Sequence, residues 1–157
     1  MSLHRALVAL VLTVPLVSTG CLNSLEPSAR PDCSALATSL ATATGLLTTP
    51  SGLRYRDVVG GPGALVTTGS RVITQYAACT TDGQTFAIAV DPSRLTFTAG
   101  EGQVFPGLDE GVIGMRLGGR RQLVVPAALG FGTNGSVGGF PVPNETIVIT
   151  LDAIGLR

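Results

Sequence analysis

Residues 102–119 read GQVFPGLDEGVIGMRLGG, and this stretch decides how the rest of the chain is interpreted. Pro106 suits the first turn of a helix, where its missing backbone N–H costs nothing. The apolar positions that follow have the helical spacing i, i+4 and i+7, namely Leu108, Val112 and Met115. Gly118 and Gly119 follow and are expected to end the helix. The stretch therefore predicts one short amphipathic helix from Pro106 to the glycine pair.

The other apolar segments have the alternation and the turn signals of β-strands. In chain order we expect strands at 53–59, 71–80, 85–90, 95–97, 120–125 and 146–154. Asp82-Gly83 marks a hairpin between the second and third of these, because Asp-Gly tolerates positive φ. A sheet has to bury its apolar face, and the single helix can cover it. The sequence predicts an α+β fold in which an antiparallel sheet folds over one short helix.

Charge and composition exclude several classes of function. The 157 residues carry a formal net charge of zero, and all ten basic residues are arginines. Binding of nucleic acid requires an excess of basic charge, so we expect no nucleic-acid partner. The one histidine, His4, lies in the leader described next, and no two cysteines are close in sequence, so we expect no metal site and no cofactor.

Residues 1–20 have the features of a secretory signal peptide. Arg5 precedes an apolar run at 6–17 that is too short to span a bilayer comfortably. The end of the segment, STGC at 18–21, resembles the lipobox of bacterial lipoproteins, in which Cys21 would carry the lipid and become the mature N-terminus. An ordinary signal peptide with Cys21 as a plain thiol is the alternative. The lipobox interpretation predicts an exported, membrane-anchored protein facing the periplasm or the cell exterior, with residues 21–49 as lipidated N-terminus and tether.

The remaining two cysteines, Cys33 and Cys79, form an even pair if Cys21 carries a lipid. Disulfides persist in exported proteins, so a Cys33–Cys79 disulfide is one hypothesis, and it would pin the N-terminal segment to the domain. Two buried free thiols are the other hypothesis, and the sequence does not choose between them.

The segment 126–143 is a long glycine-rich loop between the last two expected strands. It has no charged residue, yet it contains Phe131 and Phe140. Long loops within compact domains usually have a function, and two aromatic side chains favour a binding role over a simple connection.

Several motifs between residues 50 and 157 together resemble the FKBP-type peptidyl-prolyl cis-trans isomerases. They are Ser51-Gly52-Leu53 with Tyr55, Tyr76 with Asp82-Gly83 and Phe86, residues 102–107 (GQVFPG), 109–112 (DEGV) with Gly114-Met115, Val125-Pro126, Gly130-Phe131-Gly132 and 143–146 (PNET). Their order and spacing make the resemblance specific. It implies an isomerase domain at 50–157 with a curved antiparallel β-sheet wrapped around one short α-helix.

The resemblance also implies an apolar substrate pocket between helix and sheet. Its lining would be Tyr76, Phe86, Phe97, Val104, Phe105, Leu108, Phe131 and Ile149, with Phe140 and Pro141 on a substrate flap. The backbone N–H of Phe105 would bind a substrate carbonyl. Rotation about an Xaa–Pro bond faces a barrier of about 18–20 kcal/mol because resonance makes that bond partly double. An apolar site disfavours the planar, charge-separated amide relative to the twisted one.

Four positions depart from the pattern of the family. Ala87 stands where active relatives usually carry Asp, and Phe131 replaces a Tyr whose hydroxyl binds a substrate carbonyl. Leu108 replaces a Trp, and Ile149 replaces another aromatic residue. Two functions therefore stay open: an isomerase that assists the folding of exported proteins, or a module that binds proline-containing polypeptides with little turnover. In either case we expect a monomer.

Overall fold

The computed structural model describes residues 33, 36–37, 40 and 43–157. The expected signal peptide, the lipidation site Cys21 and most of the tether lie outside these residues. The elements in chain order are β1 (Leu47–Thr48), β2 (Arg54–Val59), β3 (Arg71–Thr80), β4 (Thr85–Ala89), β5 (Leu95–Thr98), α2 (Pro106–Val112), β6 (Arg120–Val125), the 3₁₀ turn η1 (Ala127–Leu129) and β7 (Ile147–Leu156). Among the described residues, no helix has the length and apolarity that a membrane span requires.

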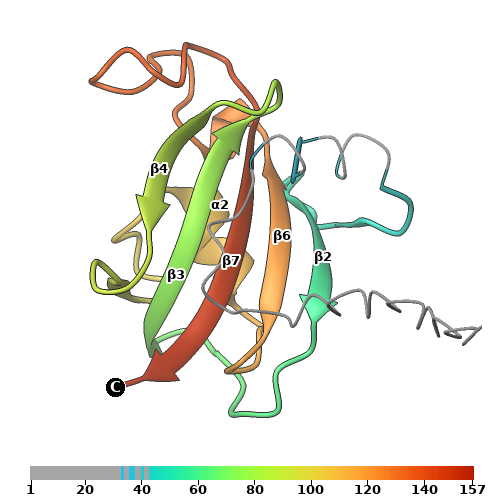
Figure 1. Cartoon of the computed structure of the whole chain (residues 1–157), viewed down its shortest axis with the longest axis vertical. Coiled ribbons are helices and arrows are strands. Elements are labelled where there is room, and N and C mark those ends of the chain that lie inside the picture. Colours follow the sequence, from blue (N-terminus) through green and yellow to red (C-terminus); the bar gives the residue numbers. More distant parts are fainter. Residues whose placement is uncertain (1–32, 34–35, 38–39, 41–42) are drawn as a thin grey trace, which may run out of the picture.

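All seven strands form one antiparallel sheet in the order β1-β2-β6-β7-β3-β4, and β5 pairs with the beginning of β3. The long strand β7 lies in the middle, where it pairs with β6 on one side and with β3 on the other. The sheet curves, and α2 lies behind it in the view of Figure 1. This confirms the predicted α+β fold, an antiparallel sheet curved around one short helix.

The helix α2 is shorter than predicted. It ends at Val112, and Ile113 already has an extended backbone with ψ of 135°. Gly114 follows with a φ of +80°, a left-handed conformation that ends helices and that glycine adopts without steric cost. Met115 therefore lies outside the helix, although it is buried in the same core. The prediction placed the end at Gly118 because it gave an isolated glycine within an apolar pattern too little weight.

The main core fills the space between α2 and the sheet. Alternate residues of β7 point into it, as the alternation predicted: Ile147, Ile149, Leu151 and Ala153. The helix approaches β6 closely at two glycines four residues apart. A Cβ atom on Gly107 would lie 2.3 Å from the Val125 side chain, and one on Gly111 would lie 2.6 Å from the Leu123 side chain. These glycines let the short helix lie directly on the sheet.

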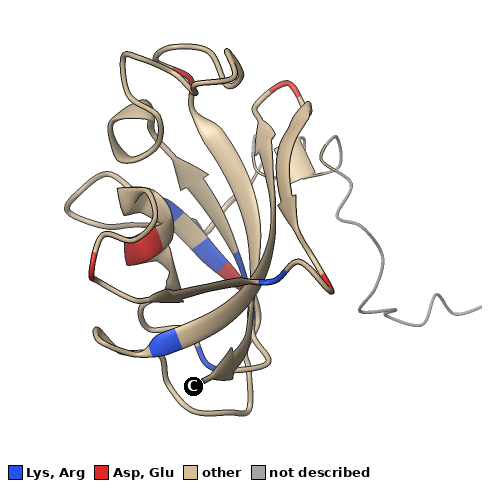
Figure 2. Ribbon diagram, turned by 90° about the vertical axis from the view of Figure 1, so that its left-hand side faces the viewer, with Lys and Arg blue, Asp and Glu red and all other residues tan. Residues whose placement is uncertain are grey.

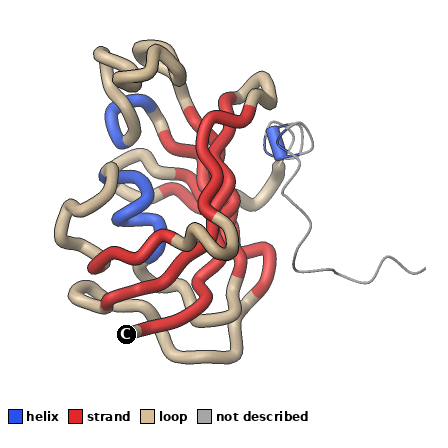
Figure 3. Tube along the Cα trace, turned by 60° about the vertical axis from the view of Figure 1, so that its left-hand side comes forward, coloured by secondary structure: helices blue, strands red, loops and turns tan. Residues whose placement is uncertain are grey.

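A smaller cluster covers the opposite face of the sheet. Helical residues from the N-terminal segment, Cys33, Leu36 and Leu40, pack against Cys79 and Val148. A disulfide joins Cys33 to Cys79, with 5.7 Å between the Cα atoms. This segment and α2 lie on opposite sides of the sheet, as Figure 3 shows. We expected the folded domain to begin near residue 50; β1, which pairs with β2, already begins at Leu47.

Candidate functional site

Four phenylalanine side chains form a continuous row at one end of the molecule, which we call the aromatic row: Phe140, Phe86, Phe131 and Phe105. The ring of Phe86 stands edge-to-face against Phe131 at 5.7 Å between centroids and against Phe140 at 6.1 Å. Phe131 also contacts Phe105, at 5.6 Å. Both distances and angles suit favourable aromatic pairs. The row joins strand β4, the loop before α2 and two parts of the loop between β6 and β7.

The eight predicted lining residues all belong to one apolar cluster, but they divide into two groups. Phe97, Leu108 and Ile149 are 3%, 1% and 0% exposed, so they form the buried floor beneath the partly exposed residues. The other five are partly exposed: Tyr76, Phe86, Val104, Phe105 and Phe131. On the flap, Phe140 is half-buried against Phe86, whereas Pro141 is buried.

Sequence reasoning missed several partly exposed residues that pack against the same cluster, among them Leu95 and Leu129. Leu95 lies two residues before Phe97 on β5, so the two side chains share a face of the strand. The alternation of that short strand was a sufficient signal for Leu95. Leu129 ends the 3₁₀ turn η1, and no periodicity in the sequence indicated its position.

The loop that presents Phe105 is held by Asp109, the first residue of the 109–112 (DEGV) motif. One carboxylate oxygen of Asp109 accepts a hydrogen bond from the Gly100 N–H at 2.7 Å, and the other accepts from the Gly102 N–H at 2.8 Å. Both glycines have positive φ. Asp109 is largely buried, so these two charge-assisted bonds fix the loop to the helix.

Phe105 itself is the residue that precedes the first turn of α2. Its carbonyl accepts hydrogen bonds from the Leu108 N–H at 3.0 Å and the Asp109 N–H at 3.1 Å. Its own N–H donates to no residue in the described part of the chain. A backbone donor at a helix start, beside exposed aromatic rings, is available to a carbonyl of a bound peptide.

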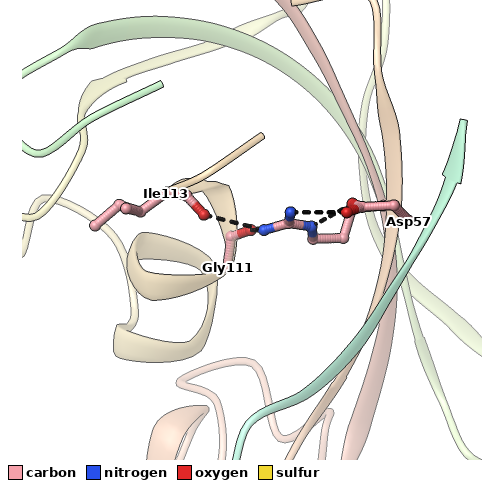
Figure 4. Close-up of polar contacts among 4 residues, drawn as sticks. Asp57, Gly111 and Ile113 are labelled. Atoms are coloured by element: carbon pink, nitrogen blue, oxygen red, sulfur yellow. Dashed lines mark hydrogen bonds and ion pairs between the residues drawn. The ribbon is translucent and has the colours of Figure 1, made fainter. Parts of the chain in front are cut away.

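The other end of α2 is fixed by Arg121 of β6, which is 5% exposed. Its Nη1 donates to the carbonyls of Gly111 and Ile113, both at 3.0 Å, and thereby satisfies two carbonyls at the helix end (Figure 4). Asp57 of β2 binds the remainder of the guanidinium, and the Tyr55 ring stacks on it at 4.5 Å. The helix α2, which carries Leu108 and begins directly after Phe105, is thus held at both ends by buried charged groups.

The flap between η1 and β7 closes on itself through backbone bonds. The Ser136 N–H donates to the Pro141 carbonyl at 3.1 Å, and the Asn144 N–H donates to the Gly132 carbonyl at 2.8 Å. Val137 at its tip is fully exposed. Residues 122–144 include no charged side chain. The flap lies in the upper third of the ribbon in Figure 2, where no segment is blue, the colour of arginine. The segment that carries Phe131 and Phe140 is therefore uncharged from Gln122 to Asn144.

Tyr76 is the one polar group of the predicted lining. It lies on β3, directly opposite Ala89 of β4. Ala87, which is also on β4, lies opposite Ala78 and is therefore diagonal to Tyr76. No side chain of the described residues forms a hydrogen bond with the Tyr76 hydroxyl. Burial raises the pKa of Tyr76 above its usual value of 10.0, because the charged phenolate would be poorly solvated there. The group is neutral at physiological pH.

The described residues include no group of three or more His, Cys, Asp and Glu side chains that could hold a metal ion. A cleft of about 200 Å³ lies at the far end of α2, lined largely by backbone and glycine between Asp57 and Gly119. It contains none of the predicted site residues.

The sequence model of the FKBP-type peptidyl-prolyl cis-trans isomerases matches residues 63–152. The chain belongs to this family. An FK506-binding protein of Streptomyces anulatus is 35% identical over 109 residues, which cover 68% of this chain and 88% of that protein. An FK506-binding protein of Neisseria meningitidis serogroup B is 34% identical, covering 66% and 94%. Other relatives are longer: the match spans 30% of FK506-binding protein 4 of Dictyostelium discoideum, at 35% identity over 71% of this chain.

Solved structures agree with the fold of this FKBP domain. The crystal structure of AtFKBP13 superposes with a TM-score of 0.66 at 28% identity, covering 73% of this chain and all of that chain. The crystal structure of FkpA from Escherichia coli gives the same TM-score at 27% identity, covering 80% of this chain and 57% of that chain. Members of the family are peptidyl-prolyl isomerases, so the aromatic row is the natural candidate for a proline-binding surface.

Proposed function

We propose that this FKBP domain is a peptidyl-prolyl cis-trans isomerase that acts on exported polypeptides at the aromatic row. The observation that carries the proposal is the free Phe105 N–H beside the rings of Phe105, Phe131 and Phe86. The N–H would hold the carbonyl of the residue before proline, and the rings would enclose the prolyl ring. No residue of this chain needs to act as a nucleophile, since only a torsion changes.

The chemistry of the row favours the twisted amide over the planar one. A planar amide separates charge between oxygen and nitrogen, and an apolar, uncharged surface solvates that separation poorly. The twisted amide loses resonance and is less polar, so the same surface disfavours it less. Because only interactions that differ between ground state and transition state accelerate a reaction, this difference lowers the barrier.

The test is an isomerisation assay on the purified chain with a short peptide that has leucine before proline. We expect acceleration that Phe105→Asp abolishes, because that change places a charge in the aromatic row. The matched control is Val58→Asp, which adds the same charge at an exposed position of β2. If the folded wild-type chain gives no acceleration, the catalytic proposal is wrong.

A binding module is the second candidate, and a specific observation favours it. The Tyr76 hydroxyl has no partner among the described residues, and both Ala87 and Phe131 lack the polar group that active relatives usually carry there. Such a site would hold proline-containing segments through its rings and turn them over slowly. Saturable binding of the same peptide, lost in Phe105→Asp and without acceleration by the wild type, would establish this function.

We further propose that the chain is an exported lipoprotein attached through Cys21. The STGC sequence at 18–21 supports this, and a Cys33–Cys79 disulfide agrees with an oxidising compartment. Radiolabelled palmitate should enter the wild-type chain in a bacterial host and should not enter Cys21→Ser. Equal labelling of both chains would contradict the assignment of Cys21.

A further inference from the structure

The face of the sheet opposite α2 carries four arginines and one aspartate, and we call it the outer arginine face: Arg54, Arg56, Arg71, Arg120 and Asp152. Strand alternation places these residues there. Tyr55 and Asp57 point inward to Arg121, so their neighbours Arg54 and Arg56 point outward. Arg120 precedes the inward Arg121 and opposes Asp152, and Arg71 precedes the buried Val72.

Arg54 and Arg71 differ from the other arginines of this face because they form no ion pair or side-chain hydrogen bond among the described residues. Arg120 binds Asp152 at 2.7 Å, and Arg56 donates to Gln122 at 2.7 Å, but Arg54 and Arg71 are exposed without an ion pair. Since the whole chain has no net charge, the positive charge of the outer arginine face must be balanced by acidic residues elsewhere in the chain. Part of the balance lies on the helix side of the sheet, where α2 is coloured for its acidic residues in Figure 2.

The arginines are spread out and do not converge on one point. They extend from the start of β2 to the start of β3, two strands that β6 and β7 separate. Aliphatic side chains lie among them, with Val59 opposite Arg120 and Ile73 two residues after Arg71. A small anion needs convergent donors, whereas a dispersed set with aliphatic neighbours fits an extended surface of repeated negative groups.

Cys33, the first residue that the structure describes, lies on this same face. Cys33 is bonded to Cys79 on the outer side of the sheet. The residues between Cys21 and Cys33 can span at most about 40 Å when fully extended. A lipid on Cys21 would therefore keep the outer arginine face near the bilayer, and the aromatic row is built around α2 and the loops on the other side of the sheet.

We propose that the outer arginine face docks on anionic phospholipid headgroups, with the aromatic row turned away from the membrane toward its polypeptide substrates. The arginines attract the negative surface, while Glu110 of α2, on the other side of the sheet, disfavours the reverse orientation. This docking does not depend on isomerase activity. It also does not require the lipid, which would only raise the local concentration of the surface.

The experiment uses the full chain with Cys21→Ser, so that no lipid can be attached. Its partition onto vesicles of phosphatidylglycerol and phosphatidylcholine at a 3:7 ratio is compared with partition onto pure phosphatidylcholine, by co-sedimentation at low salt. Arg54→Gln/Arg71→Gln removes the two unpaired arginines. Arg94→Gln/Arg116→Gln is the matched control, with the same change in net charge outside the outer arginine face.

We expect stronger partition onto the anionic vesicles, and a loss of about thirtyfold in the first double variant, from roughly 1 kcal/mol for each arginine near an anionic surface. The control should keep its affinity, and 300 mM salt should weaken binding of the wild type. Equal partition onto both vesicle types, or equal loss in both variants, would overturn the proposal. Tighter binding to a short DNA duplex than to anionic vesicles would assign the face to another polyanion.

Discussion

Asp57 and Arg121 meet side-on: the Arg121 Nε lies 2.6 Å from Asp57 Oδ1, and Nη2 lies 3.1 Å from Oδ2. The pair connects β2 to β6 while the third nitrogen of the same guanidinium binds the end of α2. Arginine suits this place because its planar fork can satisfy a carboxylate and two carbonyls at once. One buried side chain thus joins the two layers of the fold behind the aromatic row.

Removal of Asp57 should leave a buried guanidinium without its counter-charge. For Asp57→Ala we expect a loss of about 1.5–3 kcal/mol in the free energy of unfolding, the usual range for a hydrogen bond to a charged group. Urea unfolding measures this loss. The control is Asp91→Ala, which breaks the exposed pair with Arg94 and should cost less than about 1 kcal/mol. Equal losses in the two variants would show that the pair formed by the buried Arg121 and the half-exposed Asp57 has no special role.

Introduction of a carboxylate next to Tyr76 should raise isomerase turnover. Ala87→Asp places an acceptor diagonally across the β3–β4 pair from Tyr76, whose hydroxyl has no partner there. One new hydrogen bond of about 0.5–1.5 kcal/mol in the transition state corresponds to a gain of roughly two- to tenfold. Ile88→Asp, which adds the same charge at an exposed position of β4, should not change the rate. A gain in both variants would point to net charge as the cause.

Stability at high pH should depend on Tyr76. Burial raises its pKa in the folded chain, so the unfolded chain releases the phenolic proton first as pH increases. The contribution is fully present below the unfolded pKa of about 10 and is lost as pH rises through the folded pKa. Urea unfolding between pH 8 and 11 should show a smaller decline in Tyr76→Phe than in the wild type. Identical declines would contradict the raised pKa.

The loop that carries Phe105 should loosen when Asp109 is removed. Asp109→Ala deletes both acceptors of the Gly100 and Gly102 N–H groups, at a cost of at least about 1.5–3 kcal/mol in unfolding free energy. We also expect turnover to fall at temperatures where the chain stays folded, because the Phe105 N–H loses its fixed position. Glu110→Ala, which removes only an exposed bond with Ser51, is the control for both measurements.

Reduction of the Cys33–Cys79 disulfide should destabilise the domain. The bond closes a segment with a sequence separation of 46 residues, and the chain-entropy model gives a limit of about 4 kcal/mol for such a loop. Thermal unfolding with and without dithiothreitol measures the loss. Cys33→Ala/Cys79→Ala should be less stable than the oxidised wild type and should not respond to the reductant.

The sequence alone determined six of the seven described strands, the sheet curved around one short helix and the membership of the family. Alternation along β7 and the hairpin at Asp82-Gly83 are local signals, and each side chain's face follows from period two. The cluster of predicted site residues also followed from motif order. Two local features were misjudged: Gly114 ended the helix before Gly118 did, and the two-residue strand β1 was not predicted.

Only the tertiary structure decided which residues of the site are exposed and what holds them. Nothing local distinguishes Phe97, which is buried, from Phe86, which is accessible, because both are aromatic residues on short strands. Asp109 bonds to Gly100, and Arg121 bonds to Asp57 and to α2. The partners in each bond are not related by the repeat of a helix or a strand, so no periodic pattern in the sequence indicates these bonds. The physical reason is that burial and charge pairing depend on how layers pack, whereas alternation depends on the geometry of one strand.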